Sequence, residues 1–287
     1  MTNSKKLKVG IIVNYNNLHF FSWDLIKRSF ESKEYEITNL IVQKFSTSKE
    51  ISFLKRKEKV LSKKRITKFF EKKMFEFLIF FESKLSKTID PVCSVVQERL
   101  PINKFIISKI LVHPKFSENG LSYFYSKNDL DKIKSLNLDV LVKSDGGILK
   151  GNILSVCKFG VLSFQSANSN LSRINPKGFW ESLNGKIETG FSIEQITNKL
   201  EGGDTIFQGS IRTKPLFVLN QNALFYKGAS FFDILLKKIA IDNRLPKVIK
   251  KPLYKKDLNN IPSIYFQILY ILRIFLRINQ KIFQRLF

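Results

Sequence analysis

Cysteine, methionine and tryptophan are scarce in this chain of 287 residues, with two copies of each. Cys93 and Cys157 lie far apart and have no neighbouring ligand residues, which excludes a disulfide framework and a zinc ribbon and is typical of a reducing compartment. No uncharged apolar run approaches the roughly 20 residues that a membrane-spanning helix needs. A secretory signal is not recognisable either, because Asn14, Asn16 and Asn17 interrupt the first apolar run. We therefore expect a cytoplasmic protein.

Acidic residues are also few. The 24 Asp and Glu face 49 Lys and Arg, which leaves a formal net charge of +25. Such a charge attracts anions, whether nucleic acid, anionic lipid or acidic substrates, although a lysine-rich solvated surface would give the same composition. The hydrophobic share of 44%, with 27 phenylalanines, suffices for one or two ordinary cores and excludes a disordered chain.

The first part of the chain has the pattern of a βαβ unit. Residues 8–13 and 37–42 are short β-branched apolar runs, and residues 23–30 between them have helical spacing. Strands joined in this way predict an α/β, Rossmann-like fold with a parallel sheet covered on both faces. Further along the chain we expect helices over 130–136, 152–157, 194–200 and 222–242, and strands over 139–143, 160–164 and 204–211.

The segment 44–115 interrupts this pattern with 18 basic and 7 acidic residues. Aromatic residues recur at three- and four-residue spacing over 66–81, which predicts amphipathic helices inserted into the sheet domain. We expect the phenylalanines to pack on the sheet with the lysines in water. The alternative is a helix that binds a partner.

The segment 264–287 predicts a helix with a wide apolar face, because its polar residues recur every three or four positions in one narrow stripe. Residues 244–287 carry 10 basic side chains and 1 acidic one. A cationic amphipathic helix of this kind is suited to an anionic membrane surface. Closing over the sheet domain and pairing with a second subunit, as in a homodimer, are the alternatives.

Five motifs follow one another between residues 139 and 211: DVLVKSDGGILKGNIL, GVLSFQSANSN, RINPKGFWESLNG, ETGFSI and LEGGDTIFQGSI. Together they resemble the catalytic core of the formyltransferases that use 10-formyltetrahydrofolate, the family of methionyl-tRNA formyltransferase and the sugar N-formyltransferases. The resemblance implies a Rossmann-like catalytic domain over residues 1–214, with 44–115 as a basic helical insertion. Residues 215–287 would form a helical region in place of the β-rich domain of the tRNA-directed enzymes.

The family's catalytic triad is substituted in this chain. Its Asn-x-His pair and its later aspartate match Ser163, Gln165 and Glu201. Ser163 and Gln165 can donate hydrogen bonds, but Gln165 cannot titrate. Three hypotheses follow: a formyltransferase in which Glu201 or a water takes the proton, a folate- or substrate-binding relative without turnover, and a related transfer reaction on the same scaffold.

Other family positions imply the binding sites. The residues that match the folate pocket are Gly146, Gly147, Ile148, Leu149 and Asp204, and those on the acceptor side are Asn168 and Arg173. His19 follows the first strand and is a candidate acid or base, with an exposed loop histidine as the alternative. No metal-ligand spacing is present, so we expect no metal.

The resemblance predicts formyl transfer from 10-formyltetrahydrofolate to an amino group, with an amino sugar of polysaccharide biosynthesis as a candidate acceptor. The terminal helix would place the protein at the inner face of the membrane. The alternatives are a catalytically silent binding protein and a basic nucleic-acid- or membrane-binding protein. Nucleic acid is the less favoured partner, because the helical spacing after residue 215 argues against a tRNA-directed enzyme.

Overall fold

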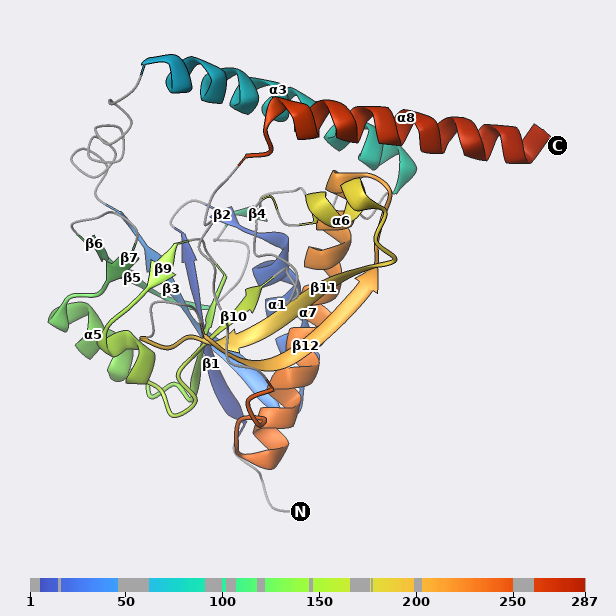
Figure 1. Ribbon diagram of the computed structural model, residues 1–287. Coiled ribbons are helices and arrows are strands. Elements are labelled where there is room, and N and C mark those ends of the chain that lie inside the picture. The colour runs from blue at the N-terminus through green and yellow to red at the C-terminus, as the bar shows by residue number, and fades with distance from the viewer. Residues whose placement is uncertain are drawn as a thin grey trace.

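The computed structural model describes residues 6–14, 17–45, 62–90, 100–101, 107–117, 122–144, 147–165, 176, 178–198, 203–249 and 261–286. A twisted sheet with helices on both faces forms the body of the molecule, and two long helices lie together across one end (Figure 1). The amino terminus lies at the opposite end (Figure 1).

The main sheet has seven strands in the order β12-β11-β10-β8-β1-β3-β5. The five strands from β10 to β5 are parallel to one another. β11 is antiparallel to β10 and to β12, which forms the edge. Their bounds are β1 Leu7–Asn14, β3 Tyr35–Gln43, β5 Ser108–Val112, β8 Val140–Lys143, β10 Val161–Gln165, β11 Glu188–Gln195 and β12 Asp204–Arg212. This arrangement confirms the α/β, Rossmann-like fold expected from the sequence.

Two smaller sheets lie beside the main one. β2 (Asn17–Leu18) pairs with β4 (Leu100–Pro101). β7 (Ser122–Phe124) pairs with both β6 (Lys115–Phe116) and β9 (Ile148–Leu149). The second of these sheets brings β9, part of the predicted folate loop, close to the main sheet.

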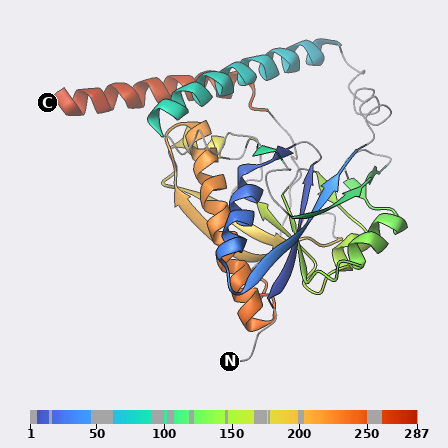
Figure 2. The same ribbon diagram turned by 180° about the vertical axis from the view of Figure 1, so that it is seen from behind.

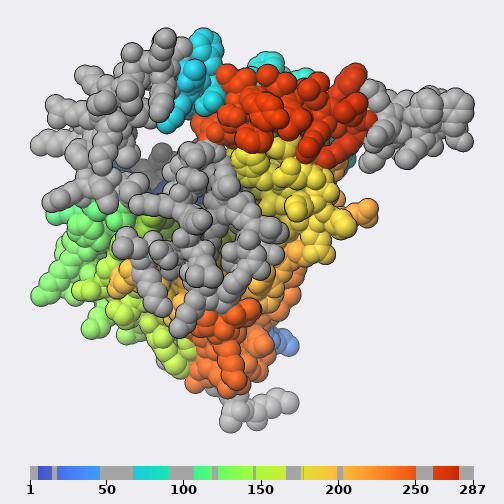
Figure 3. Space-filling model, in the orientation of Figure 1, coloured from blue at the N-terminus to red at the C-terminus, as the bar shows by residue number. Residues whose placement is uncertain are grey.

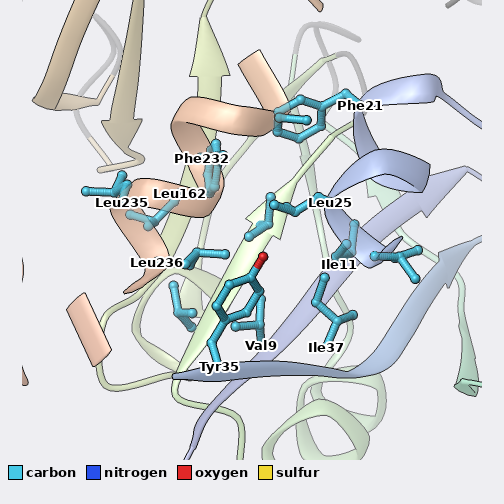
Figure 4. Packing of buried hydrophobic residues seen from close by; sticks show 14 of the residues in the cluster. Val9, Ile11, Phe21, Leu25, Tyr35, Ile37, Leu162, Phe232, Leu235 and Leu236 are labelled. Atoms are coloured by element: carbon cyan, nitrogen blue, oxygen red, sulfur yellow. The ribbon is translucent and has the colours of Figure 1, made fainter. Parts of the chain in front are cut away.

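Helices cover both faces of the main sheet. On one face α1 (Phe20–Glu31) and α7 (Phe217–Asp242) pack on the strands through Leu25, Phe232 and Leu236 (Figure 4). Tyr35 of β3 lies in the same core, and its hydroxyl donates a hydrogen bond to Asp233 Oδ1 at 2.9 Å. On the other face Ile133 and Ile153 complete a second core, from α5 (Lys127–Lys134) and η2 (Asn152–Ser155). Burial of these apolar side chains stabilises the layered fold.

The prediction of a helix over residues 194–200 is wrong for the described residues, 194–198. Glu194 and Gln195 end strand β11, and residues 196–198 are not helical. β11 is hydrogen-bonded to a strand on either side, and most of its residues are buried on both faces. A strand buried on both faces lacks the alternation of polar and apolar residues by which strands are recognised in a sequence.

In the described part of the basic segment 44–115, residues Ser62–Ile89 form the long helix α3, and Ser108–Val112 form β5 of the main sheet. α3 packs on α7 and on the last helix, α8 (Ile264–Leu286), so the expectation that its phenylalanines pack on the sheet is wrong. Phe75 is buried, but Phe77 and Phe80 are largely exposed. In the described part of the chain, no helix is both long and apolar enough to span a membrane.

Candidate functional site

Three neighbouring strands carry polar side chains on one face of the sheet. In the strand register Lys143 of β8 lies opposite Ser163 of β10, and Ser163 lies opposite Glu194 of β11. Residues paired across strands share a face, so the three side chains point the same way. All three are buried, with exposed fractions of 5%, 5% and 2%. Polar side chains seldom occupy such positions without a structural or chemical reason.

Gln165 and Ser192 extend this set, because they form the next cross-strand pair on the same face of β10 and β11. We call Lys143, Ser163, Gln165, Ser192 and Glu194 the polar row. The polar row lies where the parallel strands β8 and β10 end. In α/β sheets, ligands bind outside the carboxyl ends of the strands.

Hydrogen bonds join members of the polar row. Gln165 Nε2 donates to Ser163 Oγ at 3.2 Å. Glu194 accepts at both carboxylate oxygens, from Ser192 Oγ and from the backbone N–H of Gly203, each at 3.4 Å. Gly203 precedes β12, so the carboxylate of Glu194 also ties the start of this edge strand to the row.

Lys143 connects the polar row to a group of aromatic hydroxyls. Its Nζ lies 5.9 Å from the ring centroid of Tyr123, within reach of a cation–π interaction. The hydroxyls of Tyr123 and Tyr125 accept hydrogen bonds from Gln43 Nε2, at 3.3 and 2.6 Å. A charged lysine buried here places a cation on the strand next to Ser163.

The predicted residues of the catalytic pair and of the folate loop lie near one another in this part of the fold. Ser163 and Gln165 are hydrogen-bonded side by side, as their spacing on one strand predicts. Leu149 is fully buried in the core that contains Tyr123, and Ile148 is partly exposed next to it. Asp204 begins β12, opposite Gln195. Their roles in binding and catalysis stay predictions.

Position 147 requires glycine for a structural reason that is independent of any ligand. Its φ of +83° lies in the left-handed region that glycine favours. A Cβ at this position would also lie 3.0 Å from the Tyr123 Cε1 atom. A larger residue at position 147 would therefore strain the loop, whether or not a flat ring binds against it.

The remaining predicted site residues, Glu201, Gly146, Asn168 and Arg173, lie outside the described residues. His19 is described, and it is an exposed residue at the start of α1. The structure thus brings together two of the three triad positions and adds neighbours to them.

Lys143, Ser192 and Glu194 are the polar-row residues that sequence reasoning missed. The signal was present, because Lys143 ends the apolar run VLVK and Glu194 follows FSI. A charged residue inside a buried strand is unusual enough to mark a site. Glu194 escaped notice because its segment was expected to be a helix.

The polar row has complementary chemical abilities. The ammonium of Lys143, the hydroxyl of Ser163 and the amide of Gln165 can donate hydrogen bonds, and the carboxylate of Glu194 can accept a proton. Cys157 lies in the core below, where burial raises the pKa of its thiol to about 12, so it is no nucleophile at neutral pH. Among the described residues, no group of histidine, cysteine and acidic side chains could hold a metal ion.

Solved structures with the same fold include phosphoribosylglycinamide formyltransferase from Anaplasma phagocytophilum. It matches with a TM-score of 0.50 and 10% sequence identity, over 89% of this chain and 98% of that chain. The chain has the fold of this formyltransferase. A formyltetrahydrofolate deformylase from Pseudomonas putida also matches, with a TM-score of 0.46 and 10% identity over 85% of this chain and 68% of that chain.

Sequence comparison supports the same resemblance. Methionyl-tRNA formyltransferase from Listeria monocytogenes is 26% identical over 146 residues, which are 47% of this chain and 46% of that protein. The formyltransferase-like chain thus matches less than half the length of this curated relative. No family model matches the chain. The resemblance to formyltransferases predicted from the five motifs is confirmed.

Proposed function

We propose that this formyltransferase-like protein transfers a formyl group from 10-formyltetrahydrofolate to an amino group, with the polar row as its reaction site. The observation that carries the proposal is the register of Lys143, Ser163 and Glu194 on three adjacent strands. It puts a cation and a carboxylate on either side of the position that the family's catalytic asparagine would occupy.

The reaction asks for two kinds of group. The acceptor nitrogen attacks the formyl carbon, and negative charge develops on the formyl oxygen. The bond from that carbon to the folate nitrogen then breaks, the folate nitrogen gains a proton, and the acceptor nitrogen loses one. The hydroxyl of Ser163 and the amide of Gln165 would donate hydrogen bonds to the oxygen, and the charge of Lys143 would stabilise it further.

Glu194 is the residue best suited to move the proton. Gln165 stands where the family has a histidine, and an amide cannot titrate. The carboxylate of Glu194 lies directly across the strand pair from Ser163. We propose that Glu194 accepts the proton of the acceptor amine, with Glu201, predicted for this role from the sequence, as the alternative.

The folate loop is suited to a flat ring system. Gly147 is exposed and carries no Cβ, and the partly exposed Ile148 adds apolar surface beside it. These features fit a pteridine ring lying against the loop, as the family resemblance implies. Bound 10-formyltetrahydrofolate would supply the activated formyl group.

A silent binding protein is the second candidate. It is favoured by the internal hydrogen bonds of the polar row, in which Gln165 donates to Ser163 and Glu194 already accepts two hydrogen bonds. Groups satisfied by one another are less ready to act on a substrate. This candidate predicts folate binding without a formylated product.

The acceptor class and the place of action are narrower proposals. We propose an amino sugar of polysaccharide biosynthesis as the acceptor, and the inner face of the membrane as the place. The family resemblance suggests the first, and the cationic helix 264–287 suggests the second. A cytoplasmic site, predicted from the sequence, goes with both.

Turnover by matched variants tests the proposal. The purified protein is incubated with 10-formyltetrahydrofolate and a panel of amino sugars, and mass spectrometry detects formylated products. Glu194→Gln should lower the rate by roughly 100-fold or more, as loss of a general base does. Glu188→Gln, an exposed carboxylate on the same strand, should leave the rate unchanged. Equal rates for Glu194→Gln and wild type would remove Glu194 from the mechanism, and folate binding without any product would favour the silent protein.

A further inference from the structure

The helix α8 carries apolar residues on both of its sides: Leu269 and Ile274 pack toward the protein, and a larger set faces outward. Gln267 and Tyr270 are completely buried. The exposed side chains on the opposite side are Tyr265, Ile268, Ile271, Leu272, Phe275 and Leu276, with exposed fractions from 45% to 68%. An ordinary surface helix turns its apolar stripe to the core, whereas α8 leaves a further apolar side exposed.

α3 lies beside α8 in one layer (Figures 1 and 2) and likewise leaves apolar residues exposed, although Phe75 and Leu78 on its inner side are buried against α6 and α7. Glu82 and Ser86 are buried on its inner side, at 2% and 0% exposed. Its exposed aromatic side chains are Phe69, Phe70, Phe77, Phe80 and Phe81, at 56% to 70%. We call the two helices the helical layer, and the outward apolar residues named for each of them its outer face.

Hydrogen bonds from α3 and α8 to the start of α7 fix this orientation. Tyr270 donates to Glu82 Oε1 at 2.5 Å and accepts from the backbone N–H of Phe217 at 2.6 Å. Glu82 Oε2 accepts from the backbone N–H of Val218 at 2.9 Å. Two orphan N–H groups in the first turn of α7 are thereby satisfied, where the N-cap residue Leu216 offers no side-chain acceptor.

Arginines of α8 hold its position from the other side. Arg273 and Arg277 donate to the backbone oxygens of Leu183 and Ser182, each at 2.8 Å, at the end of the short helix α6 (Phe179–Asn184). In Figure 3 the described part of α8 lies directly on the segment that contains α6. Turning the apolar residues inward would break these hydrogen bonds, so the outer face is a fixed feature of the fold.

Basic side chains surround the phenylalanines of α3. The exposed lysines of this helix are Lys68, Lys72, Lys73, Lys84 and Lys87, against two acids outside the core, Glu71 and Glu76, within residues 68–89. Lys84 Nζ lies 4.6 Å from the ring centroid of Phe80, so cation and aromatic ring share one surface. Mixed lysine and aromatic surfaces suit the headgroup region of an anionic bilayer.

We propose that the helical layer is a membrane-binding surface, on which the outer face of α8 enters the acyl boundary of an anionic bilayer and the lysines of α3 meet its headgroups. The proposal stands independently of formyl transfer. A second copy of the chain is a less suitable occupant, because two surfaces of a protein with a net charge of +25 repel each other. Anionic lipid supplies the complementary charge.

This surface has a geometric consequence for the rest of the molecule. The helical layer lies beyond the end of the sheet toward which β1 runs, away from the amino terminus (Figure 1). The carboxyl ends of the parallel strands, where the polar row lies, are on that same side. A bound bilayer would therefore lie on the side of the candidate site.

Flotation with vesicles tests the proposal on the full chain. Vesicles of phosphatidylglycerol and phosphatidylcholine should carry the wild type, and pure phosphatidylcholine vesicles should carry much less. The double variant Leu272→Glu/Phe275→Glu should lose roughly 100-fold or more of the partition coefficient, since apolar burial and charge attraction both weaken. The matched control Ile234→Glu/Ile241→Glu changes two exposed residues of α7 and should bind within about twofold of the wild type.

Two outcomes would overturn the proposal. The first is a wild type that does not float with anionic vesicles, or a double variant that floats equally well. The second is a dimer in sedimentation velocity that the double variant dissociates, without vesicle binding by either protein, which would assign the outer face to a second copy. Phe77→Glu on α3 provides an independent variant should the double variant fail to fold, and it should weaken vesicle binding by about tenfold.

Discussion

The sheet domain and the helical layer use similar side chains in opposite ways. α7 buries Phe232 and Leu236 completely against the sheet, whereas α8 leaves Phe275 and Leu272 more than half exposed. Inside the sheet domain, apolar contacts hold α1 and α7 against the strands. Under the helical layer, a carboxylate, a tyrosine hydroxyl and two arginines join an aromatic cluster that includes Phe75 and Tyr270 in making the attachment.

An apolar stripe in a sequence therefore does not show whether that side of the helix faces the protein or the outside. Of the polar stripe predicted over 264–287, the members Gln267, Arg273 and Arg277 are described, and they lie on the side of α8 that faces the protein. The direction is decided by α6 and α7, whose helix ends offer unpaired backbone groups to charged and polar side chains.

The largest difference in the free energy of unfolding is expected between alanine variants of two phenylalanines. Phe232→Ala in α7 should lower the free energy of unfolding by about 3–5 kcal/mol, because it leaves a cavity in the main core. Phe275→Ala on the outer face should change it by less than about 0.5 kcal/mol, because that ring contacts little of the protein. Urea unfolding of both variants measures the contrast, and equal costs would mean that Phe275 is buried in a way this fold does not show.

A smaller effect is expected from the carboxylate that attaches the helical layer. Glu82→Ala should lower the free energy of unfolding by about 1–3 kcal/mol, because the backbone N–H of Val218 and the hydroxyl of Tyr270 lose a buried acceptor. Glu76→Ala, an exposed acid of the same helix, is the matched control and should have no measurable effect. Thermal and urea unfolding measure both variants. Equal free energies of unfolding would contradict the role of Glu82 in attaching the helical layer.

The smallest effect is a pH dependence of stability. Burial raises the pKa of Glu82 above its usual value, while the hydrogen bonds from Tyr270, Val218 and Phe217 lower it in part. The native protein therefore holds this proton more tightly than the unfolded chain, so stability falls as pH rises from the ordinary glutamate pKa, about 4.3, to the raised value.

Glu82→Gln removes this titration and gives the matching measurement. The stability of the wild type relative to the variant should be greatest in acid and should decline as pH rises through that window. Urea unfolding of both proteins from about pH 4 to pH 8 shows the trend. If the stability difference between the two proteins stays constant or grows with pH, burial does not disfavour the ionised form of Glu82.

Much of the fold could be predicted from the sequence, because the first βαβ unit and the strands near residues 140 and 161 have clear apolar runs. The strand over Glu188–Gln195 could not, since neighbours on both sides bury it and remove its alternation. The direction of the α3 phenylalanines could not be predicted either, because it depends on contacts with α7 and α8, far along the chain.

The candidate site was predictable at Ser163 and Gln165, because both stand at fixed spacing in one motif. Lys143 and Glu194 join them only through the register of the sheet, which no local pattern specifies. Sequence reasoning thus identified one strand of the site, and the sheet topology supplied its two neighbours.

Folate binding is the most direct test of the account, since both candidate functions of the sheet domain require it. Calorimetric titration with 5-formyltetrahydrofolate would compare the wild type with Ile148→Asp, which changes the folate loop without the strain of a substitution at Gly147. Ile187→Asp, at an exposed position away from that loop, is the control. We expect binding by the wild type and by the control, and binding weakened at least about tenfold in Ile148→Asp. Absence of binding at millimolar ligand, or equal binding by all three proteins, would contradict a folate site beside the polar row.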